Sequence, residues 1–207
     1  MLLDEYWITT CNQINMKADN ALFDLLIERY QESHRHYHTV NHLQECFDYF
    51  EAVKTLCEHP GEVACALWFH DAVYDPQKKD NELQSAKLAR GILINNKIPM
   101  HVIERIAALI LSTSHQEVAV SMDAKILLDI DLGILGAKPD RFIEYEQQIR
   151  AEYAWVPKEI YQRERGKILR GFIERPQLYA MQWFKDNVEH QARENLAISL
   201  KNLEESN

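Results

Sequence analysis

Residues 64–75 decide the fold of this chain and read Ala64-Cys65-Ala66-Leu67-Trp68-Phe69-His70-Asp71-Ala72-Val73-Tyr74-Asp75. They predict an almost wholly apolar helix that ends in a histidine and two carboxylates, with Pro60 suited to its first turn. Helical spacing places His70 on the core-facing side, and Asp71, one position further round, half faces the core. A desolvated carboxylate beside an imidazole is costly unless a charge meets it. The stretch therefore indicates either a bound metal ion or a capped helix end.

The rest of the chain predicts helix after helix and no sheet. Only 6 Gly and 6 Pro occur in 207 residues, and no segment alternates between apolar and polar side chains. Thr39 is the expected N-cap of the third helix. We expect helices, besides the central one, over residues 3–14, 18–31, 40–56, 81–94, 100–113 and 123–132, two more after Pro139 and Pro157, and a C-terminal segment over 178–205. The patterns predict an all-α helical bundle.

Charge and composition narrow the class of protein. The formal net charge of −9 argues against broad nucleic-acid binding and against attachment to an anionic membrane surface. The start of the chain lacks a basic and apolar leader pattern, and no apolar run is long enough to span a bilayer. The 4 cysteines show no paired spacing and are expected to be buried free thiols in a reducing compartment. We expect a cytoplasmic protein with no membrane partner.

Two further helices carry polar side chains that are predicted to face inward. His42 lies at the border of an apolar stripe, a position that suits a ligand facing a pocket. In the segment 128–132, helical phase places Asp131 on the face of the neighbouring leucines. Asp129 points roughly opposite, and we expect it to be solvated or paired with Lys125. Asp131 is therefore the carboxylate expected in the core.

His42, the His70-Asp71 pair and Asp131 form an ordered set on three helices. The set resembles the H…HD…D signature of the HD superfamily of metal-dependent phosphohydrolases. Further segments resemble one branch of predicted phosphohydrolases within this superfamily. They are Arg35-His36-Tyr37-His38, Asn41-His42-Leu43, 69–75, Asn81-Glu82, Ser85-Ala86, 129–132 and 149–153, together with Glu189, Arg193, Asn195 and Leu196. The resemblance covers about residues 30–200. It implies a single HD-type helical domain over 1–207, with a metal-site core over about 30–135 and C-terminal helices over about 138–205.

The resemblance assigns His42, His70, Asp71 and Asp131 as ligands of one divalent metal ion. Two imidazoles and two carboxylates suit Mn²⁺, Fe²⁺, Co²⁺, Ni²⁺ or Mg²⁺, and they tolerate Zn²⁺. Such an ion would lower the pKa of a coordinated water and neutralise charge developing on phosphorus.

A nearby carboxylate could orient or deprotonate that water, and Asp75 and Glu82 are the candidates for this catalytic role. Their ordinary alternatives are a turn cap before Pro76 and a charge at a helix N-terminus. In the related (p)ppGpp hydrolases the metal-binding pair is followed by a Glu-Asp pair. Tyr74 stands in the place of that glutamate here, so their mechanism does not carry over whole.

Five further residues are predicted to contact phosphate or support the metal ligands: Arg35, His38, His115, Arg150 and Arg193. Arg35 shortly precedes the first ligand, where nucleotide-binding relatives carry a basic residue. For the two histidines the alternative is an ordinary polar loop position. For Arg150 and Arg193 it is a surface salt bridge with Glu146 or Glu189, one turn earlier.

These features predict a metal-dependent phosphohydrolase that acts on a small phosphorylated metabolite, with a nucleotide as the first choice. Two other functions stay open. One is a regulatory nucleotide-binding module that keeps the metal without turnover. The other is a structural interaction protein whose His/Asp set closes a buried polar network. A homodimer is compatible with all three of these functions.

Overall fold

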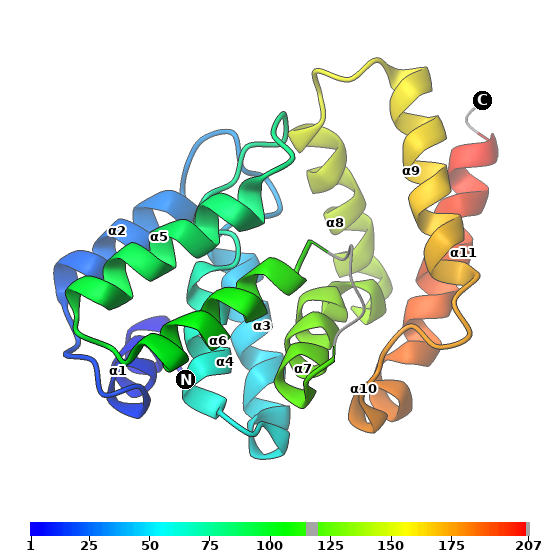
Figure 1. Ribbon diagram of the computed structural model, residues 1–207. Coiled ribbons are helices and arrows are strands. Elements are labelled where there is room, and N and C mark those ends of the chain that lie inside the picture. Colours follow the sequence, from blue (N-terminus) through cyan, green and yellow to red (C-terminus); the bar gives the residue numbers. More distant parts are fainter. Residues whose placement is uncertain (115–119, 206–207) are drawn as a thin grey trace. The chain divides into compact units, whose positions relative to one another are not determined.

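A computed structural model describes residues 1–114 and 120–205 of the chain (Figure 1). Within these residues the protein forms eleven α-helices and two short 3-10 helices, with no strand. The prediction of an all-α protein is confirmed. The chain divides into two compact units, residues 1–131 and residues 132–207. The expected single domain over 1–207 stays a prediction.

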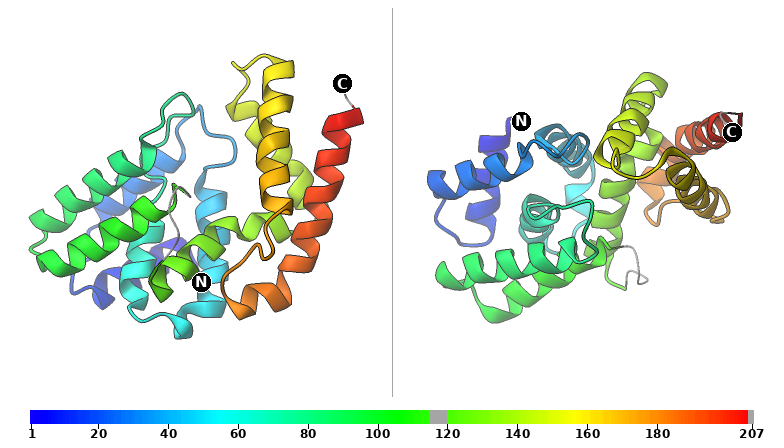
Figure 2. Two further views of the ribbon diagram at one scale, coloured as in Figure 1. Left: turned by 45° about the vertical axis from the view of Figure 1, so that its right-hand side comes forward. Right: turned by 90° about the horizontal axis from the view of Figure 1, so that it is seen from above.

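The first unit consists of seven α-helices and one 3-10 helix, close to the ranges expected from the sequence. Thr39 caps α3 as predicted, because its side chain accepts a hydrogen bond from the Asn41 N–H at 3.3 Å. In Figure 2, α5 and α6 lie side by side. The elements are α1 (Leu3–Gln13), α2 (Asn20–Tyr30), α3 (Val40–Val53), η1 (Lys54–Leu56), α4 (Pro60–Phe69), α5 (Asn81–Asn95), α6 (Met100–Ser112) and α7 (Met122–Asp131).

Helix α4 is the core of the first unit. Every residue from Gly61 to Phe69 is buried, and α4 packs against α1, α3, α6 and α7 (Figure 1). An apolar helix of this kind is stable only when neighbours cover all its sides. The predicted central helix is confirmed, including Pro60 in its first turn.

Trp68 joins three helices to α4. Its ring lies 5.4 Å from that of Trp7 on α1, 5.9 Å from Phe23 on α2 and 5.1 Å from Phe47 on α3. The indole N–H donates to the Thr10 hydroxyl at 3.3 Å. Large aromatic side chains with a satisfied polar atom contribute strongly to a core. This packing fixes the helix that ends in His70.

The N-terminus of α4 is held by charged groups from two other helices. The Asp123 carboxylate on α7 accepts hydrogen bonds from the backbone N–H groups of Glu58 and His59, at 2.7 and 3.0 Å. Glu62 on α4 is buried and forms a two-point ion pair with Arg105 on α6. A buried carboxylate needs such partners to offset its lost hydration.

The second unit consists of η2 (Leu132–Gly136), α8 (Pro139–Glu152), α9 (Lys158–Ile173), α10 (Gln182–Asn187) and α11 (Glu189–Glu205). The expected C-terminal segment over 178–205 is interrupted between α10 and α11. Helix α11 packs against α9 and η2 (Figure 2). The buried Asn195 side chain of α11 donates to the carbonyls of Leu135 and Ala137, at 2.9 and 2.8 Å. The Asn195 amide thus satisfies backbone carbonyls at the end of η2.

All four cysteines are free. Cys11, Cys46 and Cys65 are buried as predicted, whereas Cys57 is partly exposed, because it lies in the connection between η1 and α4. In the part of the chain that the structure describes, no helix has both the length and the apolar character needed to cross a membrane.

Two glycines of the second unit respond oppositely to an added methyl group. At Gly136, a Cβ would clash with the Val188 side chain and lie 2.6 Å from its carbonyl oxygen, whereas at Gly171 it would meet nothing within 4 Å. We expect Gly136→Ala to lower the free energy of unfolding by about 1–3 kcal/mol. Gly171→Ala, inside α9, should raise it by up to about 1 kcal/mol. Urea unfolding measures both, and equal stabilities of the two variants would contradict the packing at Gly136.

Candidate metal centre

Four predicted ligands converge inside the first unit. His42 comes from α3, His70 and Asp71 follow the last turn of α4, and Asp131 ends α7. The Nε2 atoms of His42 and His70 lie 3.1 Å apart. An Asp71 oxygen lies 3.5 and 3.2 Å from these two nitrogens, and an Asp131 oxygen lies 3.5 and 3.7 Å from them.

These separations suit four side chains that bind the same metal ion. Metal–ligand bonds of about 2.1 Å place adjacent ligand atoms roughly 3.0 Å apart in an octahedron and roughly 3.4 Å apart in a tetrahedron. The five separations between the imidazole nitrogens and their neighbours run from 3.1 to 3.7 Å. The chemistry of the donors, two imidazoles and two carboxylates, suits a divalent transition ion. The residues therefore fit the predicted metal, whose presence and identity stay predictions.

A backbone contact fixes which nitrogen of His70 faces the centre. Nδ1 lies 2.8 Å from the Leu67 carbonyl, which can only accept a hydrogen bond, so Nδ1 carries the proton. Nε2 of the neutral ring then has its lone pair directed at the other donors. Hydrogen bonds of this kind orient the imidazole ligands of metal sites.

Burial and charge act in opposite directions on the two imidazoles, which are each about 1% exposed. Burial lowers the pKa of His42, but Cys46, Tyr37 and the two aspartates outweigh it and hold that pKa well above its usual value. Burial also lowers the pKa of His70, but the carboxylates of Asp71 and Asp131 together outweigh burial and hold that pKa above its usual value.

Asp71 responds in the opposite sense. Burial raises the pKa of Asp71, but the charge of His70 and hydrogen bonds from both imidazoles keep it well below the usual range. The metal-free centre thus favours protonated histidines beside an ionised Asp71, and a divalent ion would have to displace protons to bind.

Cys46 is a neighbour of the centre that sequence reasoning assigned only as a buried thiol. Its sulfur lies 3.6 Å from the His42 Nε2 atom, and it belongs with His42, His70 and Asp131 to a group whose ligand atoms all lie within 4.8 Å of one another. Burial raises the pKa of this thiol, so it tends to keep its proton. The available signal was its spacing of one helical turn from His42.

The two carboxylates of α7 differ from expectation in one respect. Asp131 reaches the histidines as predicted, but Asp129 is only 3% exposed, so the expectation that it is solvated is wrong. The reason is that α7 packs against α3, α4 and α6, which cover more than one stripe of its surface. Asp131 lies near the histidines, as helical phase predicted, but helical phase did not reveal that Asp129 is the more buried of the two carboxylates.

The buried Arg35 side chain holds the backbone around Asp71 in place. Its guanidinium donates to the carbonyls of His38, Asp71 and Ala72, at 3.1, 2.7 and 3.5 Å, and to the Glu32 carboxylate at 3.0 Å. The side chain is fully buried. These bonds occupy most of its donors, so the geometry favours positioning over the predicted contact with phosphate.

His38 lies beside the centre, as expected for a residue that supports the ligands. Its ring stacks on Tyr74 with centroids 4.2 Å apart and meets the His42 ring edge-on at 5.7 Å. Tyr74 also packs against the Arg35 guanidinium at 5.4 Å. The side chains of His38 and Tyr74 therefore form an aromatic wall beside His42.

The two proposed catalytic carboxylates have different surroundings. Asp75 accepts a hydrogen bond from the Gln77 N–H at 2.9 Å, so it caps the turn before α5. Glu82 lies in the first turn of α5, on the same stripe as the buried Ser85. The Ser85 hydroxyl bonds the N–H and the carbonyl of Val73, at 3.0 and 3.2 Å, which places this stripe against the segment after Asp71.

The remaining predicted contacts lie outside the described residues or in the second unit. His115 lies outside the described residues. Arg150 and Arg193 belong to the second unit, whereas the four ligands belong to the first. Arg193 pairs with Glu189 at 2.6 Å, as its structural alternative predicted, while Arg150 donates to the carbonyls of Tyr153 and Val156. The carboxylate suggested for Arg150, Glu146, pairs with Arg165 instead.

A second group of ligand-type atoms is explained by the fold. Glu58, His59 and Asp123 also lie within reach of one ion, and two of them are exposed. The Asp123 carboxylate is already engaged by the two N–H groups that precede α4 and by the His59 ring at 3.2 Å. We interpret this group as a helix cap.

Comparisons of the chain with family models, with curated proteins and with solved structures found no match. The all-helical fold and the buried His/Cys/Asp group are compatible with an HD-type fold. Membership of the HD superfamily stays a prediction.

We expect about one transition metal per chain, with strong loss of metal in His70→Ala and Asp131→Asn. His70→Ala removes a donor nitrogen, and Asp131→Asn removes the negative charge of a donor group that lies 3.7 Å from the His70 Nε2 atom. Asp24→Asn, at an exposed position of α2, is the matched control and should keep the wild-type content. Elemental analysis after gel filtration measures the metal, and full occupancy in both site variants would rule out this centre.

The stabilisation by metal should depend on pH with a defined sign. Raised histidine pKa values contribute stability to the metal-free protein that is full below about pH 6.5 and is lost as the pH rises through the folded values. Metal binding strengthens over the same interval, because fewer protons compete. The difference in melting temperature between metal-loaded and chelated protein should therefore widen from about pH 6 to about pH 8. A difference that narrows with rising pH would contradict this electrostatic account.

Proposed function

We propose that this protein is a metal-dependent phosphohydrolase of the HD superfamily that acts on a small phosphorylated metabolite, with a nucleotide as the first substrate class to test. The observation that supports the proposal is the convergence of four donor side chains from three segments in a buried centre, with separations that suit one ion. A divalent ion held there would activate water and neutralise charge on phosphorus.

The chain's own residues would divide the remaining work. His42, His70, Asp71 and Asp131 hold the ion. The Leu67 carbonyl orients the His70 ring, and Arg35 ties down the backbone of the metal-binding pair through the carbonyls of residues 71 and 72. Preorganisation of this kind spares the site a rearrangement when charge develops in the transition state.

Glu82 is the stronger candidate for the carboxylate that takes a proton from water. Asp75 spends one carboxylate oxygen on the turn, at 2.9 Å from the Gln77 N–H. Glu82 lies in the first turn of α5, one turn before Ser85, whose hydroxyl is anchored to Val73. No hydrogen bond joins the Glu82 carboxylate to another described residue. A carboxylate free of such bonds can accept a proton without breaking local structure.

The decisive experiment is elemental analysis followed by a phosphate-release screen over nucleotides and sugar phosphates with several divalent metals. Turnover that requires the metal supports the proposal. Bound metal with tight nucleotide binding and no phosphate release would instead indicate a regulatory module. Protein free of metal, whose melting is unchanged by chelator, would indicate a structural role for the polar cluster.

Glu82→Gln should keep the metal and the melting temperature but lower turnover by roughly a hundredfold or more, the usual contribution of a general base. Asp75→Asn should mainly lower stability, because its carboxylate caps a turn. Glu28→Gln, at an exposed position of α2, is the control. Phosphate release and metal content are measured on the same preparations, and a wild-type rate for Glu82→Gln would show that the base lies elsewhere.

A further inference from the structure

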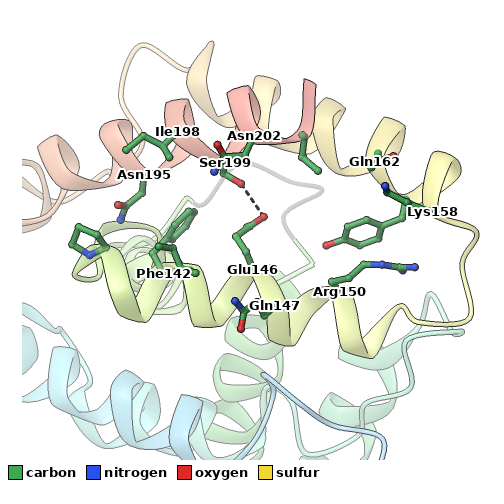
Figure 3. A pocket seen from close by; sticks show the side chains of 14 residues that line it. Phe142, Glu146, Gln147, Arg150, Lys158, Gln162, Asn195, Ile198, Ser199 and Asn202 are labelled. Carbon is green, nitrogen blue, oxygen red and sulfur yellow. Dashed lines mark hydrogen bonds between the residues drawn. The ribbon is translucent and has the colours of Figure 1, made fainter. Parts of the chain in front are cut away.

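The second unit contains a cavity of about 640 Å³ whose lining residues all come from α8, α9 and α11 (Figure 3). None of the four residues of the candidate metal centre lines this cavity. Its volume lies in the range of small-molecule pockets, about 300–1,000 Å³.

One part of the cavity is apolar. Phe142 and Ile143 of α8 and Ile198 and Leu203 of α11 line it. Ile143 is 53% exposed and Ile198 is 56% exposed. Apolar side chains gathered around a hollow are the usual walls for the body of a small ligand.

Two cations lie together at another part of the cavity, where Figure 3 shows Arg150 and Lys158 apart from Phe142 and Ile198. Arg150 donates only to the carbonyls of Tyr153 and Val156, so no described carboxylate neutralises its charge. Lys158 has no ion pair with any described residue. The chain as a whole carries a net charge of −9, which makes two uncompensated cations in one pocket a specific feature.

The acidic residue of the cavity does not cancel these charges. Glu146 forms an ion pair with Arg165 and accepts a hydrogen bond from the Ser199 hydroxyl at 2.9 Å, as drawn in Figure 3. Its charge is therefore balanced by a third cation. Arg150 and Lys158 stay available to an anion.

Tyr161 adds a polar group whose bonding capacity is unused. Its hydroxyl is buried and has no hydrogen-bond partner among the described residues, although Tyr161 lines the cavity and the Arg150 guanidinium packs on its ring at 4.6 Å. Burial raises the pKa of Tyr161 to about 12, so the hydroxyl keeps its proton and can donate. A buried donor without a partner destabilises the free protein, and a ligand oxygen would satisfy it.

We propose that this cavity binds a small amphipathic anion, with an extended apolar body against Phe142 and Ile198 and a carboxylate or phosphate group at Arg150, Lys158 and Tyr161. The apolar walls supply binding by burial, and the cations with the phenol select the charge of the head group. The site needs neither the metal nor catalytic turnover to be occupied.

The test compares two probes of equal apolar length and opposite charge, decanoate and decylammonium, by titration calorimetry on the full chain. Decanoate should bind at one saturable site per chain, and decylammonium should bind at least about tenfold more weakly. Equal affinities, or no saturable binding of decanoate up to about 1 mM, would overturn the proposal.

Variants separate the parts of the site. Lys158→Gln should weaken decanoate about tenfold and remove the preference over decylammonium, whereas Lys167→Gln, on the same helix outside the cavity, should not. Ile198→Gln should weaken both probes, while Ile168→Gln, which is 50% exposed and outside the cavity, leaves them unchanged. Wild-type affinities in Lys158→Gln and Ile198→Gln would assign the binding to another surface.

Tyr161→Phe distinguishes a ligand contact from a structural role. The change removes a hydroxyl that makes no hydrogen bond, so the melting temperature should stay equal or rise, while decanoate binds several-fold more weakly. A variant that melts lower and binds decanoate as tightly as the wild type would show that the phenol serves the fold alone.

Discussion

The burial of α4 on all sides is the constraint on which the first unit depends. A helix with no polar face must be enclosed, and the rings of Trp7, Phe23 and Phe47 around Trp68 show how three other helices are brought to it. The polar groups at its two ends then have to be satisfied in the interior. Before the first turn of the helix, the Asp123 carboxylate accepts hydrogen bonds from two backbone N–H groups. After its last turn, the Leu67 carbonyl accepts a hydrogen bond from the His70 ring. The metal centre is thus a consequence of where an enclosed helix ends.

Charge balance is the second requirement of that interior. Two imidazoles and two carboxylates share a space with separations of 3.1 to 3.7 Å, where solvent screens little. Without an ion, protons on the histidines balance the aspartates, as the raised pKa values of His42 and His70 and the lowered pKa of Asp71 indicate. A bound divalent cation would offset the negative charges of the aspartates in place of the protons on the two histidines. The buried Arg35 side chain donates to the backbone carbonyls of Asp71 and Ala72 and to that of His38, so it joins the segment after α4 to the segment before α3.

The second unit treats its polar groups differently. Asn195 donates to backbone carbonyls, and Arg193 donates to backbone carbonyls and to the Glu189 carboxylate. In the cavity between α8, α9 and α11, by contrast, Lys158 and the Tyr161 hydroxyl make no hydrogen bond with a described residue. Folded proteins satisfy nearly all buried polar groups, so the unused Tyr161 hydroxyl beside an apolar wall is typical of a place where a ligand completes the bonding. The exposed Lys158 lines the same cavity and adds a positive charge.

The sequence by itself determined the helical class, most helix boundaries, the Thr39 cap and the identity of four inward-facing polar residues, because apolar periodicity and capping are local properties. It could not determine which partners each face meets. Asp129 is covered because three helices pack on α7. Arg35 donates hydrogen bonds to carbonyls of a segment 36 residues away, and Cys46 lies beside the His42 ring. The cavity of the second unit likewise joins residues of α8 and α11 that are more than 50 positions apart, such as Glu146 and Ser199. Only the tertiary structure decides these matters, because contacts between distant segments depend on how the helices pack and not on the pattern within any one of them.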